Sequence, residues 1–213
     1  MVFNDHINEV TFLGTNYERI TRDNLSRIYC QLPGDLEERL QAKKWKNRFC
    51  FCAFGEDCCL GPDMITLSGE PIVDPRALLI SLYARHASPK PIQLEPFLSF
   101  RDLPNSMPYQ GAFSANCEIV LVCHVPIINE KQEMIKRAFD GRNGFAKSGG
   151  DFSFILFPFP KIALCYIFYL PDEEFAASVT CLFSANALSF MPIDGLADVA
   201  EHTSKRIIQF IRG

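Results

Sequence analysis

The sequence lacks a strong excess of charge of either sign. Its 21 basic and 25 acidic side chains, among 213 residues, leave a formal net charge of −4 at pH 7. Proteins that bind nucleic acids generally carry a basic surface, so this balance argues against a general nucleic-acid binder, and we expect no nucleic-acid partner. Charged residues at 22% and aromatic residues at 12% also exclude a disordered or collagen-like chain.

The common catalytic motifs are also missing. The chain has no G-x-S-x-G elbow, no H-E-x-x-H pair, no Walker loop and no G-x-G-x-x-G after a predicted strand. Its histidines, at positions 6, 86, 124 and 202, lie in unrelated contexts. A pair formed in the folded chain by Cys165 or Cys181 with a histidine stays open, but nothing in the sequence favours it over core packing. We therefore predict no catalytic residue, and binding ahead of catalysis.

No targeting or membrane-spanning segment is visible. Residues 1–8 contain no apolar stretch with a basic flank, so we expect a cytoplasmic protein. The most apolar segment, residues 152–170, has Lys161 as its single charge but carries Pro158 and Pro160. Two prolines interrupt the hydrogen bonds of a spanning helix, whereas a hairpin of two buried strands accommodates them. We therefore expect no membrane partner.

Hydrophobic residues make up 48% of the chain, which is enough to form a sizeable core. The length predicts a single domain over residues 1–213, with a helical N-terminal part to about residue 48 and a mixed body over 49–213. In the first half we expect a turn or a helix cap at 21–24, a helix over 35–45, strands at 49–54, 58–60 and 64–67, and a helix over 75–86.

The second half begins with an irregular proline-rich segment over 89–108. A helix or a strand should follow over 110–125, then a helix over 130–139, strands at 152–157, 162–170 and 178–184, and a closing helix over 196–211. The connections between these strands are too short for helical crossovers, so the strands are antiparallel neighbours. The predicted fold class is α+β, with a mostly antiparallel sheet and flanking helices.

Nine cysteines are the first candidates for chemistry. An odd number cannot all pair within one chain, and a reducing cytosol keeps thiols free, so we expect no structural disulfide. Four of them fall within ten residues, but Cys50 and Cys52 are separated by one residue and Cys58 and Cys59 by none, unlike the wider pairs of zinc sites. We expect buried structural thiols, with a metal or cluster site that recruits Cys117 or Cys123 as the open alternative.

Two charged stretches also attract attention. The basic run of residues 43–48 would end the predicted helix, where cations suit the negative end of its dipole; it could bind phosphate, but a solvated helix end explains it. The second stretch, Pro171-Asp-Glu-Glu-Phe, joins two predicted strands through three adjacent carboxylates. Magnesium or calcium would prefer such oxygen ligands, and the simpler explanation is an exposed loop that keeps the sheet edge soluble.

Several motifs, in a fixed order, resemble those of a known family. They are Leu98-Ser-Phe-Arg-Asp-Leu-Pro, Gln110-Gly-Ala-Phe, Gly149-Gly-Asp-Phe-Ser-Phe, Phe159-Pro-Lys-Ile-Ala-Leu, Pro171-Asp-Glu-Glu-Phe, Leu182-Phe-Ser-Ala-Asn-Ala and Met191-Pro-Ile-Asp-Gly-Leu-Ala. Over most of its length the chain resembles a family of anaerobic bacteria and archaea, catalogued as domain of unknown function number three-seven-eight-six. Some relatives carry an iron-sulfur-type domain like those of corrinoid proteins, so the resemblance implies a link to anaerobic corrinoid or one-carbon metabolism.

The resemblance also implies which residues form a site. Family hallmarks match the acidic loop, the Gly-Asp pair and the Ser-Phe-Arg segment. The ligand-binding candidates are Phe100, Arg101, Asp151, Asp172, Glu173, Glu174 and Phe175. Arg101 is expected to contact an anion and Glu173 and Glu174 to contact a polar group or a cation; Asp172 with these two glutamates is the alternative metal site. Ser184 stands where relatives have aspartate and Tyr169 near a common tryptophan, and both departures count against a metal or catalytic site.

Three functions of different classes follow. The first is a non-catalytic protein that binds a small ligand or cofactor of unknown identity, with a pocket near Phe100, Arg101 and Glu174. The second is an interaction subunit or homo-oligomer with a protein partner, suggested by 19 phenylalanines. The third is a metal-dependent enzyme, which requires Asp151 and the carboxylates of the acidic loop to converge.

Overall fold

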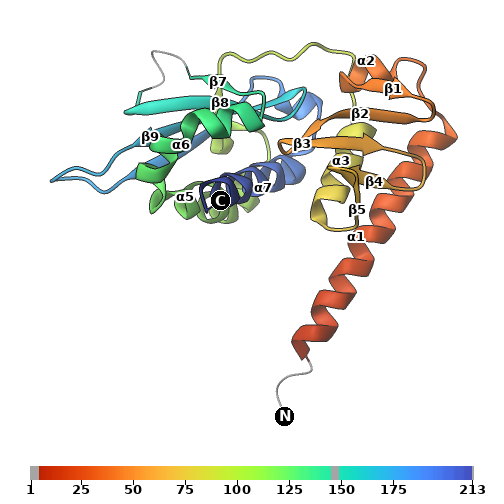
Figure 1. The fold of residues 1–213 in the computed structure, drawn as a ribbon, viewed down its shortest axis with the longest axis horizontal. Helices are drawn as coiled ribbons and strands as arrows, with labels where there is room; N and C mark the ends of the chain where they lie inside the picture. Colours follow the sequence, from red (N-terminus) through yellow and green to blue (C-terminus); the bar gives the residue numbers. More distant parts are fainter. Residues whose placement is uncertain (1–4, 145–148, 213) are drawn as a thin grey trace. The chain divides into compact units, whose positions relative to one another are not determined.

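The computed structural model describes residues 5–144 and 149–212, which divide into two compact units (Figure 1). Unit 1 comprises the chain up to residue 51 together with residues 57–89, and unit 2 comprises residues 52–56 together with the chain from residue 90. The single domain expected over 1–213 stays a prediction. The main boundary between the units lies between residues 89 and 90, whereas the sequence predicted a change from helical to mixed structure between residues 48 and 49.

Each unit combines helices with a five-stranded antiparallel sheet, which confirms the predicted α+β class. The strands form two sheets rather than the one expected. In the described part of the chain no single helix is long and apolar enough to span a membrane, although Met107–Val122 and Val125–Ala138, bent by 94°, meet the length and composition test as a pair.

Unit 1 is built from three helices and a meander of short strands. The helices are α1 (Asp5–Cys30), α2 (Leu36–Leu40) and α3 (Pro75–Arg85), and α1 packs on α3. The strands, in sheet order, are β1 (Lys43–Trp45), β2 (Arg48–Ala53), β3 (Glu56–Leu60), β4 (Ile65–Leu67) and β5 (Glu70–Ile72). Three of the hairpins turn on two residues, and the first turn residue is Lys46, Phe54 or Ser68, each with φ between 50° and 55°.

Two expectations for unit 1 are wrong. The helix predicted from Asp35 through Trp45 ends at Leu40, because Gln41 adopts a left-handed conformation with φ of 52° and the chain then turns into β1. The basic run therefore lies on a β-hairpin and not at a helix end. The turn or cap expected at residues 21–24 lies inside the continuous helix α1, where Asn24 is buried and donates to the hydroxyl of Ser81 at 2.9 Å.

The sheet of unit 1 has one buried and one accessible face. Along β2, Phe49 and Phe51 are buried, whereas Arg48 and Cys50, which alternate with them, are more accessible. Directly opposed residues of neighbouring strands point to the same side, and Lys43 pairs with Cys50 and Trp45 with Arg48. We call the accessible side, which carries Lys43, Trp45, Arg48 and Cys50, the outer face.

The sheet of unit 2 has the order β6-β10-β9-β8-β7. These strands are β6 (Leu98–Ser99), β7 (Arg142–Asn143), β8 (Phe152–Phe159), β9 (Ile162–Tyr169) and β10 (Ser178–Phe183). The later three match the strands expected from the sequence. Residues 160–161 connect β8 to β9, and Pro158 lies within β8 where the register shifts between Leu156 and Phe159. The irregular segment contains only β6 and the short 3-10 helices η1 (Phe100–Asp102) and η2 (Met107–Tyr109).

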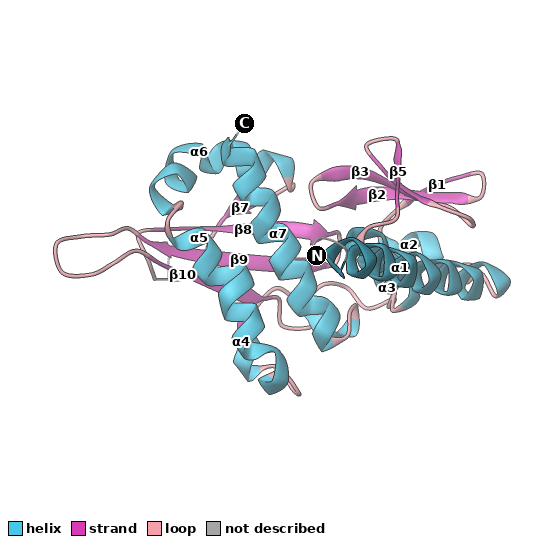
Figure 2. Cartoon of the chain, turned by 90° about the horizontal axis from the view of Figure 1, so that it is seen from below, coloured by secondary structure: helices cyan, strands magenta, loops and turns pink. Residues whose placement is uncertain are grey.

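Helices cover one face of this sheet (Figure 2). They are α4 (Gln110–Phe113), the π-helix η3 (Ser114–Ile119), α5 (Val120–Val122), α6 (Val125–Ala138) and α7 (Ile193–Arg212), with the 3-10 helix η4 (Ala187–Ser189) before α7. The ambiguous segment 110–125 is therefore helical. Ile92, Leu94 and Phe97 of the irregular segment pack on the other face.

Phenylalanine fills the core of both units. Phe49 and Phe51 pack near Tyr29 and Tyr83 in unit 1, and in unit 2 the rings of Phe152 and Phe168 stack with centroids 4.6 Å apart. Among the phenylalanines whose side chains the structure describes, only Phe175 is exposed. The phenylalanine surplus is thus accounted for mainly by core packing and not by an open apolar surface.

Candidate functional site

Phe100 and Arg101, both predicted to bind a ligand, have different surroundings in η1. The Phe100 ring is buried and stacks on Phe113 with centroids 4.3 Å apart, next to Phe183. The Arg101 side chain is 74% exposed and lies 3.9 Å from the exposed carboxylate of Asp102. Such a surface ion pair contributes little to stability. Phe100 is thus a core residue, and Arg101 is a solvated cation.

The acidic loop, residues 172–175, joins β9 to β10 at the far end of the sheet (Figure 2). Asp172 accepts hydrogen bonds from the backbone N–H groups of Glu174 at 2.9 Å and Phe175 at 2.7 Å, and these bonds lower its pKa. The Asp172 carboxylate therefore shapes the turn, while Glu173 and Glu174 are exposed. Within residues 5–144 and 149–212, no three His, Cys, Asp or Glu side chains are grouped to hold a metal ion.

The Gly-Asp pair has a backbone role beside this loop. Gly150 has φ of +76°, and a Cβ atom there would lie 2.7 Å from Cγ2 of Ile167 and from the carbonyl oxygen of Phe168. The N–H of Asp151 donates to that carbonyl oxygen at 2.9 Å, and its carboxylate accepts from the N–H of Leu170 at 2.6 Å. Glycine at 150 thus allows the close approach that continues the pairing of β8 with β9.

The predicted site residues fall into two separate groups: Asp151 lies beside the acidic loop, whereas Phe100 and Arg101 do not. Ser99, beside Phe100, pairs with Leu182 of β10, whereas Tyr169, before the acidic loop, pairs with Ser178. These two points on β10 are four residues, or about 13 Å, apart along the strand. The pocket expected near Phe100, Arg101 and Glu174 is therefore not formed by these residues.

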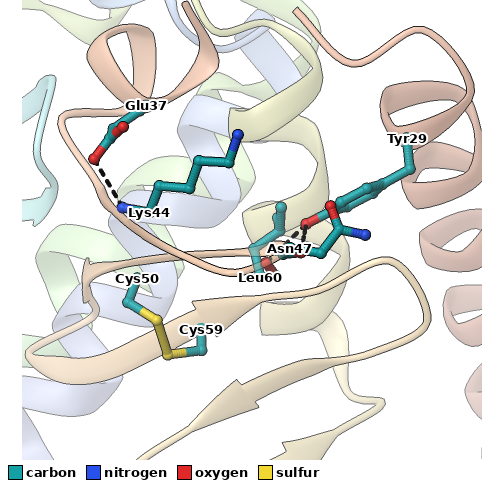
Figure 3. Close-up of a disulfide and its surroundings, with 7 residues drawn as sticks. All are labelled: Tyr29, Glu37, Lys44, Asn47, Cys50, Cys59 and Leu60. Carbon is teal, nitrogen blue, oxygen red and sulfur yellow. Dashed lines mark hydrogen bonds between the residues drawn. A yellow bond between two sulfur atoms is a disulfide. The ribbon is translucent and has the colours of Figure 1, made fainter. Parts of the chain in front are cut away.

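The cysteines also depart from expectation, because Cys50 and Cys59 form a disulfide (Figure 3). The prediction of no disulfide was wrong since it rested on cysteine number and compartment, whereas strand pairing decides which cysteines meet. The turn at Phe54-Gly55 places Cys50 of β2 opposite Cys59 of β3, with Cα atoms 4.3 Å apart. That separation is close to the lower end of the range for disulfides.

Three other cysteines are buried thiols of unit 2, as expected. Burial raises the pKa of Cys165 to about 11 and that of Cys181 well above its ordinary value. Cys117 lies 3.9 Å from the hydroxyl of Tyr166, which in turn lies 3.1 Å from the hydroxyl of Ser204. Protonated, enclosed thiols are poor nucleophiles, so this arrangement favours packing over a catalytic cysteine.

The β1–β2 hairpin carries a dense group of basic side chains. Lys43, Lys44, Lys46 and Arg48 fall within six residues around Trp45, and all five side chains are exposed. Lys46 Nζ lies 4.7 Å from the centroid of the Trp45 ring, which is 61% exposed. In the part of the chain that the structure describes, no carboxylate lies within ion-pair distance of these four cations. We call residues 43–48 the basic hairpin.

A hollow of about 480 Å³ lies beside the basic hairpin on the outer face. Its lining residues are Trp45, Lys46, Asn47, Arg48, Gly61, Pro62, Asp63 and Met64. Gly61 allows a close approach of the chain there, because a Cβ atom at this position would lie 3.2 Å from the carbonyl oxygen of Met64 and 3.7 Å from Cγ of Arg48. The hollow combines an apolar wall with two cations, and Asp63 is its one lining carboxylate.

The tip of the basic hairpin is held by groups behind it (Figure 3). The hydroxyl of Tyr29 donates to the carbonyl oxygens of Asn47 and Leu60, each at 3.0 Å. Partial burial raises the pKa of Tyr29 to about 12. The carboxylate of Glu37 accepts from the backbone N–H of Lys44 at 2.9 Å, and the disulfide joins β2 to β3. The exposed side chains therefore project from a backbone that is fixed at several points.

Comparison with known families identifies the family of this chain. The family model described as Domain of unknown function (DUF3786) matches residues 33–206, which is most of the chain. The chain belongs to the DUF3786 family. Comparisons with curated proteins and with solved structures gave no match.

In this DUF3786 protein the matched region includes the basic hairpin, the irregular segment and the acidic loop. Tyr29, which holds the tip of the hairpin, precedes that region. Sequence reasoning missed Trp45 as a site residue because it assigned the residue to a helix. The sequence signal was a short run of alternating side chains over residues 43–45 followed by two residues, Lys46 and Asn47, that can form a tight turn. This pattern is typical of a hairpin.

Proposed function

We propose that this DUF3786 protein is a binding protein whose basic hairpin holds a phosphate-bearing polyanion. The observation that supports the proposal is the grouping of four cations without an ion-paired carboxylate around an exposed tryptophan and a hollow. The backbone of the hairpin is already ordered, so binding an anion to these unpaired cations costs little conformational entropy of the backbone. Lysine and arginine are the side chains that contact phosphate oxygens.

Charge at this site is local and not a property of the whole chain. A net charge of −4 limits non-specific attraction to polyanions at long range. Within a Debye length of about 10 Å, however, the attraction of a ligand to the four cations of the basic hairpin is only partly screened by salt. The proposal therefore predicts a defined site with one class of affinity and not general adhesion to acidic polymers.

The test is a calorimetric titration with inorganic polyphosphate at several salt concentrations. Binding should weaken as salt rises, because each neutralised phosphate releases a counterion. The double variant Lys43→Glu, Lys46→Glu should lose binding, whereas Arg137→Glu, an exposed cation of α6, should bind as the wild type does. Equal loss in both variants, or no binding by the wild type, would overturn the proposal.

A further inference from the structure

We infer that the polyanion is a single-stranded nucleic acid, one base of which stacks on Trp45 while its phosphates contact the neighbouring cations. This inference rests on the proposed function and specifies its ligand. It departs from the expectation of no nucleic-acid partner, which rested on the net charge of the whole chain. Trp45 lies directly opposite Arg48 on the outer face of the sheet. A ring and a guanidinium thus project from adjacent strands toward the same side, as stacking and phosphate contacts on one nucleotide require.

The hollow favours a ligand that has both a flat ring and a negative charge. Trp45, Pro62 and Met64 supply apolar surface, and Lys46 and Arg48 supply charge at the same opening. Met64, like Trp45, is a large apolar side chain left exposed, at 45%. Inorganic polyphosphate would satisfy the cations but leave this apolar surface without a partner. A nucleotide satisfies both, because every base has an apolar face beside a phosphate.

The shape of the site distinguishes a single strand from the other polyanions. In a duplex the faces of the bases are stacked on one another, so Trp45 could reach a base only after unstacking. A membrane surface would suit several protruding apolar side chains on one face, whereas here Trp45 and Met64 line a hollow together with Lys46, Arg48 and Asp63. Asp63 in the same hollow opposes anions and disfavours a densely charged surface such as a bilayer of acidic lipids.

Trp45 is the single tryptophan of the chain, so its fluorescence reports on the site without interference. The probes are oligothymidylate, inorganic polyphosphate of similar charge, and vesicles that contain an acidic phospholipid. Oligothymidylate should quench the emission of Trp45, whereas polyphosphate should bind with little quenching. With labelled oligothymidylate followed by anisotropy, Trp45→Ala should weaken binding about tenfold and Trp45→Phe much less, since a stacked base contributes about fivefold to over a hundredfold.

The matched control is Phe175→Ala, which removes another exposed aromatic ring and should leave oligothymidylate binding unchanged. If oligothymidylate binds but Trp45→Ala has no effect, or if it binds no more tightly than polyphosphate, the inference is overturned while the proposed function stands. If the vesicles shift the emission of Trp45 and oligothymidylate does not, the inference is overturned in favour of a membrane surface. If neither polyphosphate nor oligothymidylate binds, both proposals fail.

Discussion

Trp45 and Arg48 are a directly opposed pair at the end of the β1–β2 hairpin, and the turn that joins them is held by the hydroxyl of Tyr29. This places the exposed ring and its neighbouring cation on a backbone anchored to a helix. Tyr29 is protonated and therefore uncharged at neutral pH, so it does not attract the ligand electrostatically. Its contribution to binding is therefore to fix geometry.

Tyr29→Phe should reduce both stability and polyanion affinity. It removes the donor to two carbonyl oxygens, which should cost about 1 kcal/mol of the free energy of unfolding. Polyphosphate affinity should fall although no cation is lost. Chemical denaturation and calorimetry measure the two effects. An unchanged affinity would show that the hairpin does not depend on this anchor.

The same variant isolates a pH effect. Tyr29 has a folded-state pKa of about 12, against 10.0 ordinarily, so the unfolded state loses this proton first as the pH rises. The stability associated with neutral Tyr29 is fully present below pH 10 and is lost as the pH rises from 10 to 12. The difference in unfolding free energy between wild type and Tyr29→Phe should therefore shrink over that range. A constant difference would contradict the raised pKa.

Removing the disulfide should destabilise the protein. Cys50 and Cys59 close a short ring across β2 and β3, and the double serine variant should lose about 2–3 kcal/mol of unfolding free energy on chain-entropy grounds. Dithiothreitol should have the same effect on the wild type and none on the variant. Cys123→Ser, which replaces an exposed cysteine of unit 2, is the control and should unfold as the wild type does.

Asp63→Asn should strengthen polyanion binding. Asp63 is the carboxylate that lines the hollow beside Lys46 and Arg48. Removal of one negative charge near the surface should raise polyphosphate affinity about threefold at low salt, and the gain should vanish at high salt. Calorimetry at two ionic strengths tests this, and weaker binding by the variant would show that Asp63 assists the ligand.

Gly150→Ala should destabilise unit 2 without affecting the basic hairpin. The added Cβ atom would meet Ile167 and the backbone of Phe168 at 2.7 Å, at a positive φ that alanine disfavours. We expect a loss of about 1–3 kcal/mol, measured by thermal unfolding. Gly34→Ala, where nothing lies within 4 Å of the new atom, is the control. A neutral outcome at 150 would show that the Gly-Asp motif has another role.

The family-based site has its own test. The family resemblance implies that Arg101 contacts an anion. The structure leaves Arg101 solvated in η1, next to the β6 residue Ser99, which pairs with the end of β10 opposite to the acidic loop. Arg101→Glu should therefore bind polyphosphate as the wild type does, whereas Arg48→Glu should not. Loss of binding in Arg101→Glu would indicate that the irregular segment contributes to the binding site.

The sequence predicted those elements whose signal is local. The strands over 152–170 follow from an apolar run broken by Pro158 and Pro160, and α3 begins at Pro75 after Asp74, whose side chain accepts from the N–H of Arg76 at 2.8 Å. The basic hairpin was missed because Asp35 can cap a helix that continues through Leu40, and the left-handed residue that ends the helix, Gln41, is not glycine.

The site was less predictable than the fold, since it depends on which segments meet. No spacing rule pairs Cys50 with Cys59 until the turn at Phe54 is known. Conversely, the motif residues near Gly150 and Asp172 are accounted for by backbone hydrogen bonds and close approach. A residue can thus mark a family because the chain must turn there.

The hairpin tip formed by residues 52–56 has a practical consequence. These residues group with unit 2, where the Phe54 ring packs against Phe159 at 5.0 Å and the carboxylate of Glu56 lies 3.5 Å from the guanidinium of Arg206. Their neighbours on both sides along the chain belong to unit 1. No single cut of the polypeptide therefore yields two intact halves: a fragment that ends at residue 89 carries Phe54 away from its aromatic partner. Limited proteolysis at that junction should produce fragments that remain associated or unfold together.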